Sequence, residues 1–410
     1  MADVRPFICC RPKAELAAEL AALPYDVFSR EEAAAEIEKH PRSFLRIDKS
    51  WAVLPDDVGE YDAQVYEKAA ELFTADLRDG VFINEGEEHY FIYRLARGEQ
   101  AQTGIVSCIA VRDFESSVLK RHENTRSFKL EDRVNHIRAL QAHTGPIFVA
   151  HRHIEALEAA KVQVLETAAP LYDFYAPDGV RHTVWRVDEQ ETGSTIRNCF
   201  VALNSLYIVD GHHRASAAVK VSRERGEEDG CFLIVAFPAE QLRLLDYNRV
   251  VFDTNGLSKA ELLEQIAAFF TVERLTVDHV KPTQKGEFAM YAEGEWYRLT
   301  VNEDLRPDDT VASLDVSLLH DLLLEPILGI DDPKSSDRIS FVSGVRGLEG
   351  LRRRADETRS DSAPQSGIAF ALYPCAMEEL FEVADEGRLM PPKSTWFEPK
   401  PRSGLFIHAF

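Results

Sequence analysis

Residues 207–216 have the sequence YIVDGHHRAS. They end an apolar, β-prone run that begins at Cys199, and they lead into an alanine-rich stretch that favours helix as far as Arg223. Gly211 lets the chain turn sharply where the run ends. The sequence therefore predicts a strand, a tight turn and a helix at this point.

The flanking sequence predicts a mixed α/β fold around this unit. Residues 231–237 are almost wholly apolar and stand between Gly230 and Pro238, which is typical of a strand buried on both faces. We expect this strand beside the one that ends at Asp210. Apolar spacing predicts further strands at residues 43–47, 89–95 and 104–111 and helices at residues 61–77 and 154–166.

At 410 residues the chain is longer than a single core usually allows, which favours two domains. We expect a main α/β domain over residues 1–256. A helix followed by several strands predicts a smaller α+β domain over residues 257–365. Residues 366–410 are expected to form a C-terminal helix and a basic tail that packs back on the main domain.

The charge balance limits the partners of the chain. It has 69 acidic and 47 basic residues and a net charge of -22. The average field is repulsive toward nucleic-acid phosphates and anionic membranes, so no nucleic-acid or membrane partner is expected. A local basic cluster could still hold a small phosphate-bearing molecule.

The cysteines and the apolar segments indicate a protein of the reducing cytoplasm. Six cysteines are scattered with no CxxC pair, which disfavours both a zinc site and a disulfide framework. The first residues lack an apolar signal region, and no stretch reaches the roughly 18 apolar residues of a membrane span. The sequence leaves the oligomeric state open.

The turn at residues 210–214 is the first candidate site. Unpaired N–H groups at the start of the expected helix favour an anion. Beside Gly211, the side chains of His212, His213 and Arg214 add phosphate donors, and His213 can also move protons. Alternatively, Asp210 only caps the helix, one histidine is a buried hydrogen-bonding group and the arginine pairs with a surface acid. No metal site is predicted, because no carboxylate and histidine pair has matching spacing.

A second candidate segment is KRHENT at residues 120–125, with Arg133 a little further along. His122 and Arg133 are candidate phosphate ligands. Glu123 is a candidate acid or base. A charged, solvated helix face has the same appearance, and that alternative stays open.

Two further segments are candidates. The tail at residues 390–404, MPPKSTWFEPKPRSG, has a proline-stiffened backbone and four candidate phosphate ligands, namely Lys393, Ser394, Thr395 and Lys400. A basic tail can equally be disordered. The segment LPYDV at residues 23–27 places Asp26 in a turn, which alone would be a connection between helices.

Together these segments resemble the domain-of-unknown-function 1015 family of bacterial and archaeal proteins. The resemblance spans nearly the whole chain. It rests on segments in the same order at residues 22–27, 43–45, 122–125, 132–133, 145–148, 210–214, 247–250 and 392–395.

The DGHHR segment is in turn similar to the phosphate-binding segment of the ParB/sulfiredoxin-like fold, which includes partition nucleotidases, sulfiredoxin and free-serine kinases. This resemblance implies a core of that fold with large insertions. Sulfiredoxin would need a cysteine where this chain has His212. The acidic balance disfavours the partition role, so the serine kinases are the nearest functional model.

The resemblance implies a phosphotransferase that uses ATP or ADP with Mg²⁺ and acts on a small hydroxyl metabolite, with L-serine as the implied substrate. His213 and Arg214 would hold the phosphate, and Lys393 and Lys400 would neutralise charge. One carboxylate among Asp26, Glu123 and Asp210 would orient or deprotonate the hydroxyl. Two alternatives remain: a phosphatase or other hydrolase of a phosphorylated metabolite, and a non-catalytic sensor of a nucleotide or phosphorylated ligand.

Overall fold

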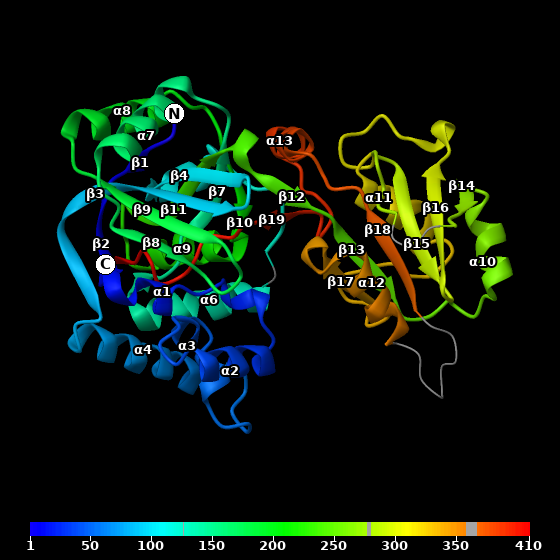
Figure 1. The fold of residues 1–410 in the computed structure, drawn as a ribbon, viewed down its shortest axis with the longest axis horizontal. Coiled ribbons are helices and arrows are strands. Elements are labelled where there is room, and N and C mark those ends of the chain that lie inside the picture. The colour runs from blue at the N-terminus through cyan, green and yellow to red at the C-terminus, as the bar shows by residue number, and fades with distance from the viewer. Residues whose placement is uncertain (126, 277–279, 358–366) are drawn as a thin grey trace. The chain divides into compact units, whose positions relative to one another are not determined.

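The computed structural model describes residues 1–410 except residues 126, 277–279 and 358–366. The chain divides into two compact units, one of residues 1–242 and 399–410 and one of residues 243–398. Each unit combines sheet and helices (Figure 1), so the expected mixed α/β class with a second, smaller α+β unit is confirmed.

The limits of these units differ from the boundaries expected at residues 256 and 365. Strands β13 (Tyr247–Val251) and β18 (Ile368–Leu372) pair with each other in the sheet of the second unit. Residues 367–398 therefore belong to the second unit, and only residues 399–410 return to the first. Part of the expected 257–365 domain, residues 277–279 and 358–365, lies outside the described residues. A strand pattern shows that a strand forms but not which strand it joins, which explains the difference.

The first unit is built on a ten-stranded sheet with eight strands in its main path. Along that path the strands are β5 (Leu119–Lys120), β10 (Leu206–Asp210), β7 (Ile147–His151), β11 (Cys231–Pro238), β4 (Gln100–Ala110), β3 (Phe82–Arg97), β9 (Arg181–Val187) and β8 (Tyr172–Tyr175). Strands β1 (Val4–Arg5) and β2 (Phe7–Pro12) pair with β4 and β3, and β6 (Ala142–His143) pairs with β20 (His408–Ala409).

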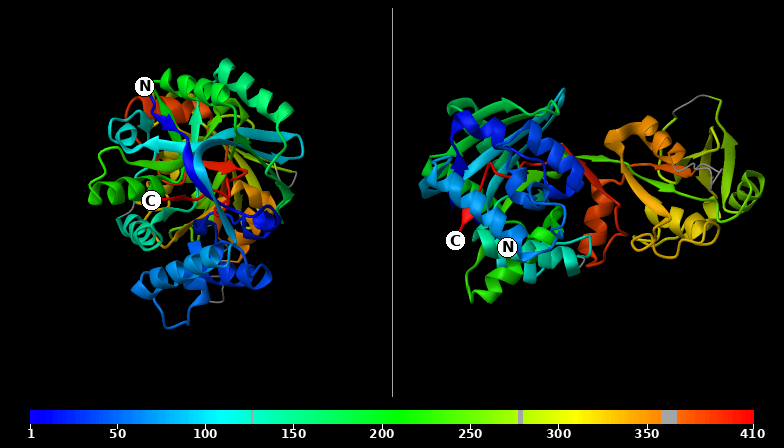
Figure 2. Two further views of the ribbon diagram at one scale, coloured as in Figure 1. Left: turned by 90° about the vertical axis from the view of Figure 1, so that its left-hand side faces the viewer. Right: turned by 90° about the horizontal axis from the view of Figure 1, so that it is seen from below.

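The helices of the first unit lie around this sheet. They are α1 (Ala17–Leu20), α2 (Arg30–Lys39), α3 (Leu45–Asp48), α4 (Ala63–Arg78), α5 (Val111–Glu115), α6 (Ser127–Leu140), α7 (Glu155–Thr167), α8 (Gln190–Val201) and α9 (His212–Glu224). Helices α7 and α8 lie side by side, while α2, α3 and α4 form a separate group that packs on α6 (Figure 1, Figure 2).

The two faces of the sheet bury different partners, because successive side chains of a strand point to opposite faces. Ile92 and Ile208 belong to a core cluster that includes buried residues of α6 to α9. Phe91 and Tyr93 instead contact the ring of Phe406, at centroid distances of 5.7 Å and 5.4 Å. The returning C-terminal segment is therefore part of the core of the first unit.

The strand expected at residues 43–47 does not form. Residues 45–48 make the short helix α3, in which Leu45 and Ile47 are fully buried. A short apolar run has the same composition in a buried strand and in a buried helix, and periodicity alone cannot separate the two.

The second unit has a six-stranded antiparallel sheet and its own core around Val250, Trp296 and Leu351. Its other strands are β14 (Phe270–Arg274), β15 (Glu287–Ala292), β16 (Glu295–Val301) and β17 (Ile339–Ser343), and β12 (Arg243–Leu245) pairs separately with β19 (Trp396–Glu398). Its helices are α10 (Lys259–Ile266), α11 (Asp315–Leu319), α12 (Gly347–Asp356) and α13 (Met377–Asp385).

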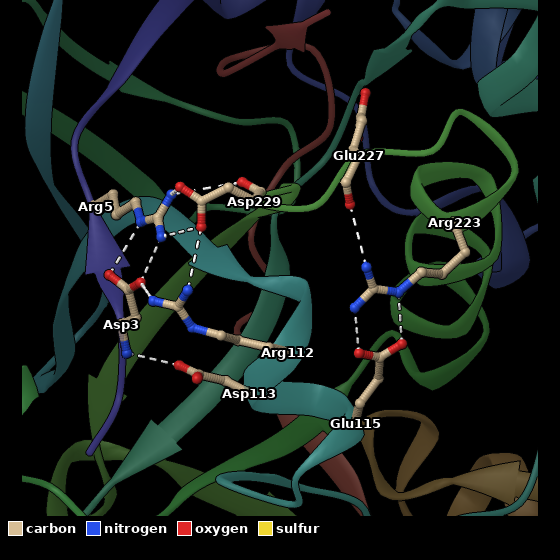
Figure 3. A network of polar contacts seen from close by, with 8 residues as sticks. All are labelled: Asp3, Arg5, Arg112, Asp113, Glu115, Arg223, Glu227 and Asp229. Atoms are coloured by element: carbon tan, nitrogen blue, oxygen red, sulfur yellow. Dashed lines mark hydrogen bonds and ion pairs between the residues drawn. The ribbon is translucent and has the colours of Figure 1, made fainter.

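Charged side chains join the N-terminal strand to the ends of its neighbours (Figure 3). Arg5 donates to both Asp3 and Asp229, and Arg112 contacts the same two carboxylates. The backbone N–H of Asp3 donates to Asp113 at 2.6 Å. The more exposed of these ion pairs, which involve Arg112 and Asp229, stabilise the fold little. Among the described residues, no helix combines the length and the apolar character needed to cross a membrane.

Candidate functional site

The expected strand, turn and helix are present at residues 206–224, but the strand does not begin at Cys199, because residues 199–201 end helix α8. Strand β10 ends at Asp210, with a register shift against β7 between Ile208 and Asp210. Such a bulge redirects the side chains at the end of a strand. Gly211 follows with φ 97° and ψ 27°, and α9 begins at His212.

Glycine at position 211 is required for two independent reasons. Its positive φ is strained for residues that carry a Cβ. A Cβ at this position would also lie 2.9 Å from Nη2 of Arg214. In its present position the guanidinium of Arg214 lies over the turn, in space that a side chain at residue 211 would enter.

Arg214, Asp210 and Lys400 form a partly buried charged triad. Nη2 of Arg214 donates to Oδ2 of Asp210 at 3.2 Å, and Nζ of Lys400 donates to Oδ1 at 2.8 Å. Nη1 of Arg214 donates to the carbonyl of Pro146 at 3.0 Å. The side chain of Lys400 is only 6% exposed. The structure thus brings the central segment and the C-terminal tail together.

Asp210 is fully ionised at neutral pH. Burial alone would raise the pKa of this carboxyl, but Lys400 and Arg214 outweigh that effect and lower the pKa to about 2. A carboxylate with such a low pKa is a weak base. Its role in this geometry is to hold the two cations.

The pairing of two distant strands brings the KRHENT segment to the same turn. Strand β5 runs parallel to β10, with Leu119 opposite Leu206 and Lys120 opposite Tyr207. Because both strands run in the same direction, the residues that follow β5 lie beside those that follow β10. His122 is buried and hydrogen-bonds to the backbone of Ile208.

His122, Glu123 and His212 form a compact cluster. The two imidazole rings are 4.5 Å apart in an edge-to-face arrangement. One ligand atom from each of the three residues lies within 4.8 Å of the others. Burial lowers the pKa of His122 to about 4 and that of His212 well below its usual range, so both rings are neutral.

A pocket of about 440 Å³, including the part open to solvent, lies beside the charged triad. Arg214 and Ala218 of α9 line it together with Arg133 of α6. The remaining lining residues are Tyr25, Asp48, His136, Ile137, His143, Thr144, Gly145, Ile147, Leu233 and Ser403.

Arg133 is fixed in this pocket by three neighbours. Its guanidinium lies 3.7 Å from the ring centroid of Tyr25. Its Nε donates to Oδ2 of Asp132 at 2.9 Å, and its Nη1 donates to the carbonyl of Asp48 at 3.4 Å. Stacking and hydrogen bonds together leave the planar guanidinium little freedom.

Several lining residues were not expected from the sequence. Asp48 accepts a hydrogen bond from Thr144 at 2.9 Å and lies 3.8 Å from Nε2 of His136. Ser403 forms a backbone bridge with Ala22. Tyr25 lies within the candidate segment LPYDV, and Ser403 lies within the candidate tail at residues 390–404. Both residues could therefore have been predicted from the sequence. Asp48 and Thr144 carry no sequence signal.

Asp26 lies on the 3₁₀ turn Tyr25–Val27, where its side chain is exposed. It does not line the pocket, but its neighbour Tyr25 does. Nζ of Lys49 donates to the carbonyl of Phe28 at 2.6 Å, which fixes this turn. The N-terminal segment is thus placed at the site through Tyr25.

Lys393, Ser394 and Thr395 belong to the second unit. The carbonyl of Lys393 accepts a hydrogen bond from Arg249 at 3.1 Å, and its Nζ lies 5.5 Å from the ring centroid of Tyr247. Ser394 is buried and donates to the carbonyl of Pro391 at 2.5 Å. Phosphate binding by these three residues stays a prediction.

The solved structures that resemble this chain include a free serine kinase and SbnI. A free serine kinase in complex with AMP is 14% identical, with a TM-score of 0.35 over 71% of this chain and 86% of that one. SbnI from Staphylococcus aureus, truncated at its C-terminus, is 14% identical, with a TM-score of 0.37 over 72% and 84%. A conserved hypothetical protein from Pyrococcus furiosus is 15% identical, with a TM-score of 0.35 over 75% and 96%.

No match was found among curated proteins. The family model described as "Protein of unknown function (DUF1015)" matches residues 4–317, which confirms the family expected from the sequence. This match includes the turn, the KRHENT segment and Arg133. The chain therefore belongs to the DUF1015 family.

Proposed function

We propose that the first unit binds the phosphates of ATP or ADP in the pocket beside α9 and transfers a phosphoryl group to a small hydroxyl metabolite. L-serine is the first acceptor to test. The observation that carries the proposal is that Arg133 and Arg214 line the same pocket. A guanidinium binds phosphate through two parallel hydrogen bonds, and two fixed guanidiniums suit a polyphosphate.

At the turn itself the charge favours an anion, even though the chain as a whole is acidic. Arg214 and Lys400 share one carboxylate, Asp210, so the triad keeps one net positive charge. The N-terminus of α9 adds the positive end of a helix dipole beside it. His212 and His213 in the first turn are further proposed phosphate neighbours.

In the proposed reaction the acceptor hydroxyl oxygen forms a bond to the terminal phosphorus of the nucleotide. The bond from that phosphorus to the bridging oxygen breaks, and the nucleotide leaves with one phosphate fewer. The hydroxyl proton passes to a carboxylate. Asp26 and Glu123 are the candidates, because Asp210 is committed to Lys400 and Arg214.

Magnesium enters this scheme with the nucleotide, as part of the substrate. Asp48 supplies a carboxylate in the lining of the pocket. Carboxylate and phosphate oxygens are the ligands that Mg²⁺ prefers. The arginines and the metal ion would together neutralise the charge of the phosphates as the phosphoryl group is transferred.

The proposal is tested by following the phosphorus nuclear magnetic resonance spectrum of the protein with ATP, Mg²⁺ and L-serine. We expect a phosphoserine signal that grows with the ADP signals. The Asp26→Asn variant should lower kcat by about 10²- to 10⁴-fold, as expected for loss of a general base. Asp57→Asn, which changes an exposed aspartate, is the matched control and should leave kcat unchanged.

The same experiment separates the two alternatives. Release of inorganic phosphate at a rate independent of serine would indicate a hydrolase. Nucleotide binding without turnover, for serine and for a panel of hydroxyl metabolites, would indicate a sensor.

A further inference from the structure

We propose that His122, Glu123 and His212 form a binding site for a divalent transition-metal ion, with Zn²⁺ as its natural occupant. The site does not depend on the proposed function. It is made from the two motifs that the sequence singled out, which the pairing of β5 with β10 brings together.

The types and spacing of the candidate ligand atoms suit a transition-metal ion. Two imidazole nitrogens and one carboxylate oxygen lie within 4.8 Å of one another. A tetrahedral Zn²⁺ with bonds of about 2.1 Å holds its ligand atoms about 3.4 Å apart, so small side-chain rotations would complete the site. Two histidines with one carboxylate, and a fourth position left open, is the composition of several catalytic zinc sites.

The hydrogen bonding of the two histidines also suits a metal site. The side chain of His122 donates a hydrogen bond to the backbone of Ile208. A metal-binding histidine usually makes such a bond through one ring nitrogen, which orients the other toward the metal. Nε2 of His212 is buried and has no hydrogen-bond partner among the described residues, although the residue is only 5% exposed. A metal ion would satisfy a buried nitrogen that otherwise costs free energy.

The neighbouring carboxylate and the choice of ligands bear on which ion would bind. Asp210 interacts electrostatically with both histidines. Imidazole ligands favour zinc and related transition metals over Mg²⁺, which prefers oxygen ligands. A bound ion with an open position could activate a water molecule or bind a phosphate oxygen. If Glu123 holds the metal, Asp26 remains as the proton acceptor of the proposed reaction.

Two other groups of side chains in the described residues could compete for metal. Cys108, Cys231 and His408 form one in the first unit, and His320, Asp321 and Glu325 form the other in the second unit. The absorption spectrum with Co²⁺ distinguishes the cysteine-containing group from the proposed site. Thiolate ligands produce intense sulfur-to-cobalt charge-transfer absorption, which nitrogen and oxygen ligands do not. The substitution Glu325→Gln distinguishes the group in the second unit from the proposed site.

The test is calorimetric titration of the full chain, freed of metal by a chelator, with Zn²⁺, together with visible absorption on adding Co²⁺. We expect one tight Zn²⁺ site that millimolar Mg²⁺ does not occupy, and cobalt absorption without a thiolate band. Glu123→Gln, which changes a half-buried side chain, should weaken Zn²⁺ binding at least tenfold. Glu325→Gln and Cys231→Ser should leave it unchanged.

Three results would overturn the proposal: no Zn²⁺ binding by the wild type, equal affinity in Glu123→Gln, or loss of binding in either control variant. His212→Gln provides a second variant whose folding is checked by circular dichroism. Because the titration contains no nucleotide, its outcome is separate from that of the phosphotransfer experiment.

Discussion

At the scale of single residues, Gly211 gives the sharpest expectation. Gly211→Ala should lower the free energy of unfolding by about 1–3 kcal/mol through backbone strain, and it should also displace Arg214. Gly226→Ala is the matched control, because Gly226 also has a positive φ, 71°, but has no atom within 4 Å of an added Cβ. Chemical denaturation should show a loss in both variants, while ATP titration should show weaker binding only for Gly211→Ala. Equal ATP affinity in both would contradict the placement of Arg214.

Asp315 in the second unit predicts a pH dependence of stability. Its carboxyl is buried, and burial is the main cause that raises its pKa to about 7, against the effect of a hydrogen bond from Gly286. The folded chain therefore holds one more proton than the unfolded chain between about pH 4 and pH 7. The free energy of unfolding should fall as the pH rises through this window, by on the order of 1–4 kcal/mol.

Urea denaturation at a series of pH values checks this expectation. Asp315→Asn stays neutral at every pH and should lose this part of the pH dependence. Asp308→Asn, an exposed neighbour, is the control and should behave as the wild type. A wild type and an Asp315→Asn variant with parallel pH profiles would contradict the buried, protonated carboxyl.

At the scale of secondary-structure elements, β10 anchors the site in the core. Ile208 is fully buried on the helix-covered face of the sheet. Ile208→Ala should lower the free energy of unfolding by about 2–5 kcal/mol, because it leaves a cavity. Val201→Ala, at the 37% exposed end of α8, should have a much smaller effect in the same denaturation experiment. Similar losses would mean that β10 is not a core strand.

The sequence predicts helices and strands well where the apolar periodicity is strong or where glycine and proline mark the ends of an element. The expected helices at residues 61–77 and 154–166 correspond to α4 and α7, and the strand, turn and helix around Gly211 are present. The sequence does not predict strand partners: residues 231–237 are expected beside the strand that ends at Asp210, but β7 lies between β10 and β11. The parallel pairing of β5 with β10 brings His122 and Glu123 to His212, and the returning tail brings Lys400 to Asp210. Such long-range pairings depend on the packing of the whole sheet, and a local pattern does not contain them.

At the scale of the whole molecule, the second unit is an insertion in the first. Residues 243–398 form one continuous segment, and its two ends pair as β12 and β19, with Arg243 opposite Glu398. We expect residues 243–398 to fold alone. Residues 1–242 should not, because Leu405, Phe406 and Ile407 of the missing segment are fully buried.

Thermal unfolding followed by circular dichroism checks both expectations. A chain in which a short Gly/Ser linker joins Leu242 to Pro399 should unfold cooperatively, because the ends of the removed segment lie side by side. Cooperative unfolding of residues 1–242 alone would contradict the structural role of the C-terminal segment.

The nucleotide site beside α9 is tested most directly by calorimetric titration of ATP and ADP, with Mg²⁺, into the wild-type chain and an Arg214→Ala variant. Arg138→Ala removes an exposed arginine of α6 that pairs with Glu224, and it serves as the control. We expect binding to the wild type and to Arg138→Ala, and at least a tenfold weaker affinity in Arg214→Ala. Absence of binding to the wild type, or equal affinity in all three proteins, would contradict the assignment of the pocket beside α9 as a nucleotide phosphate site.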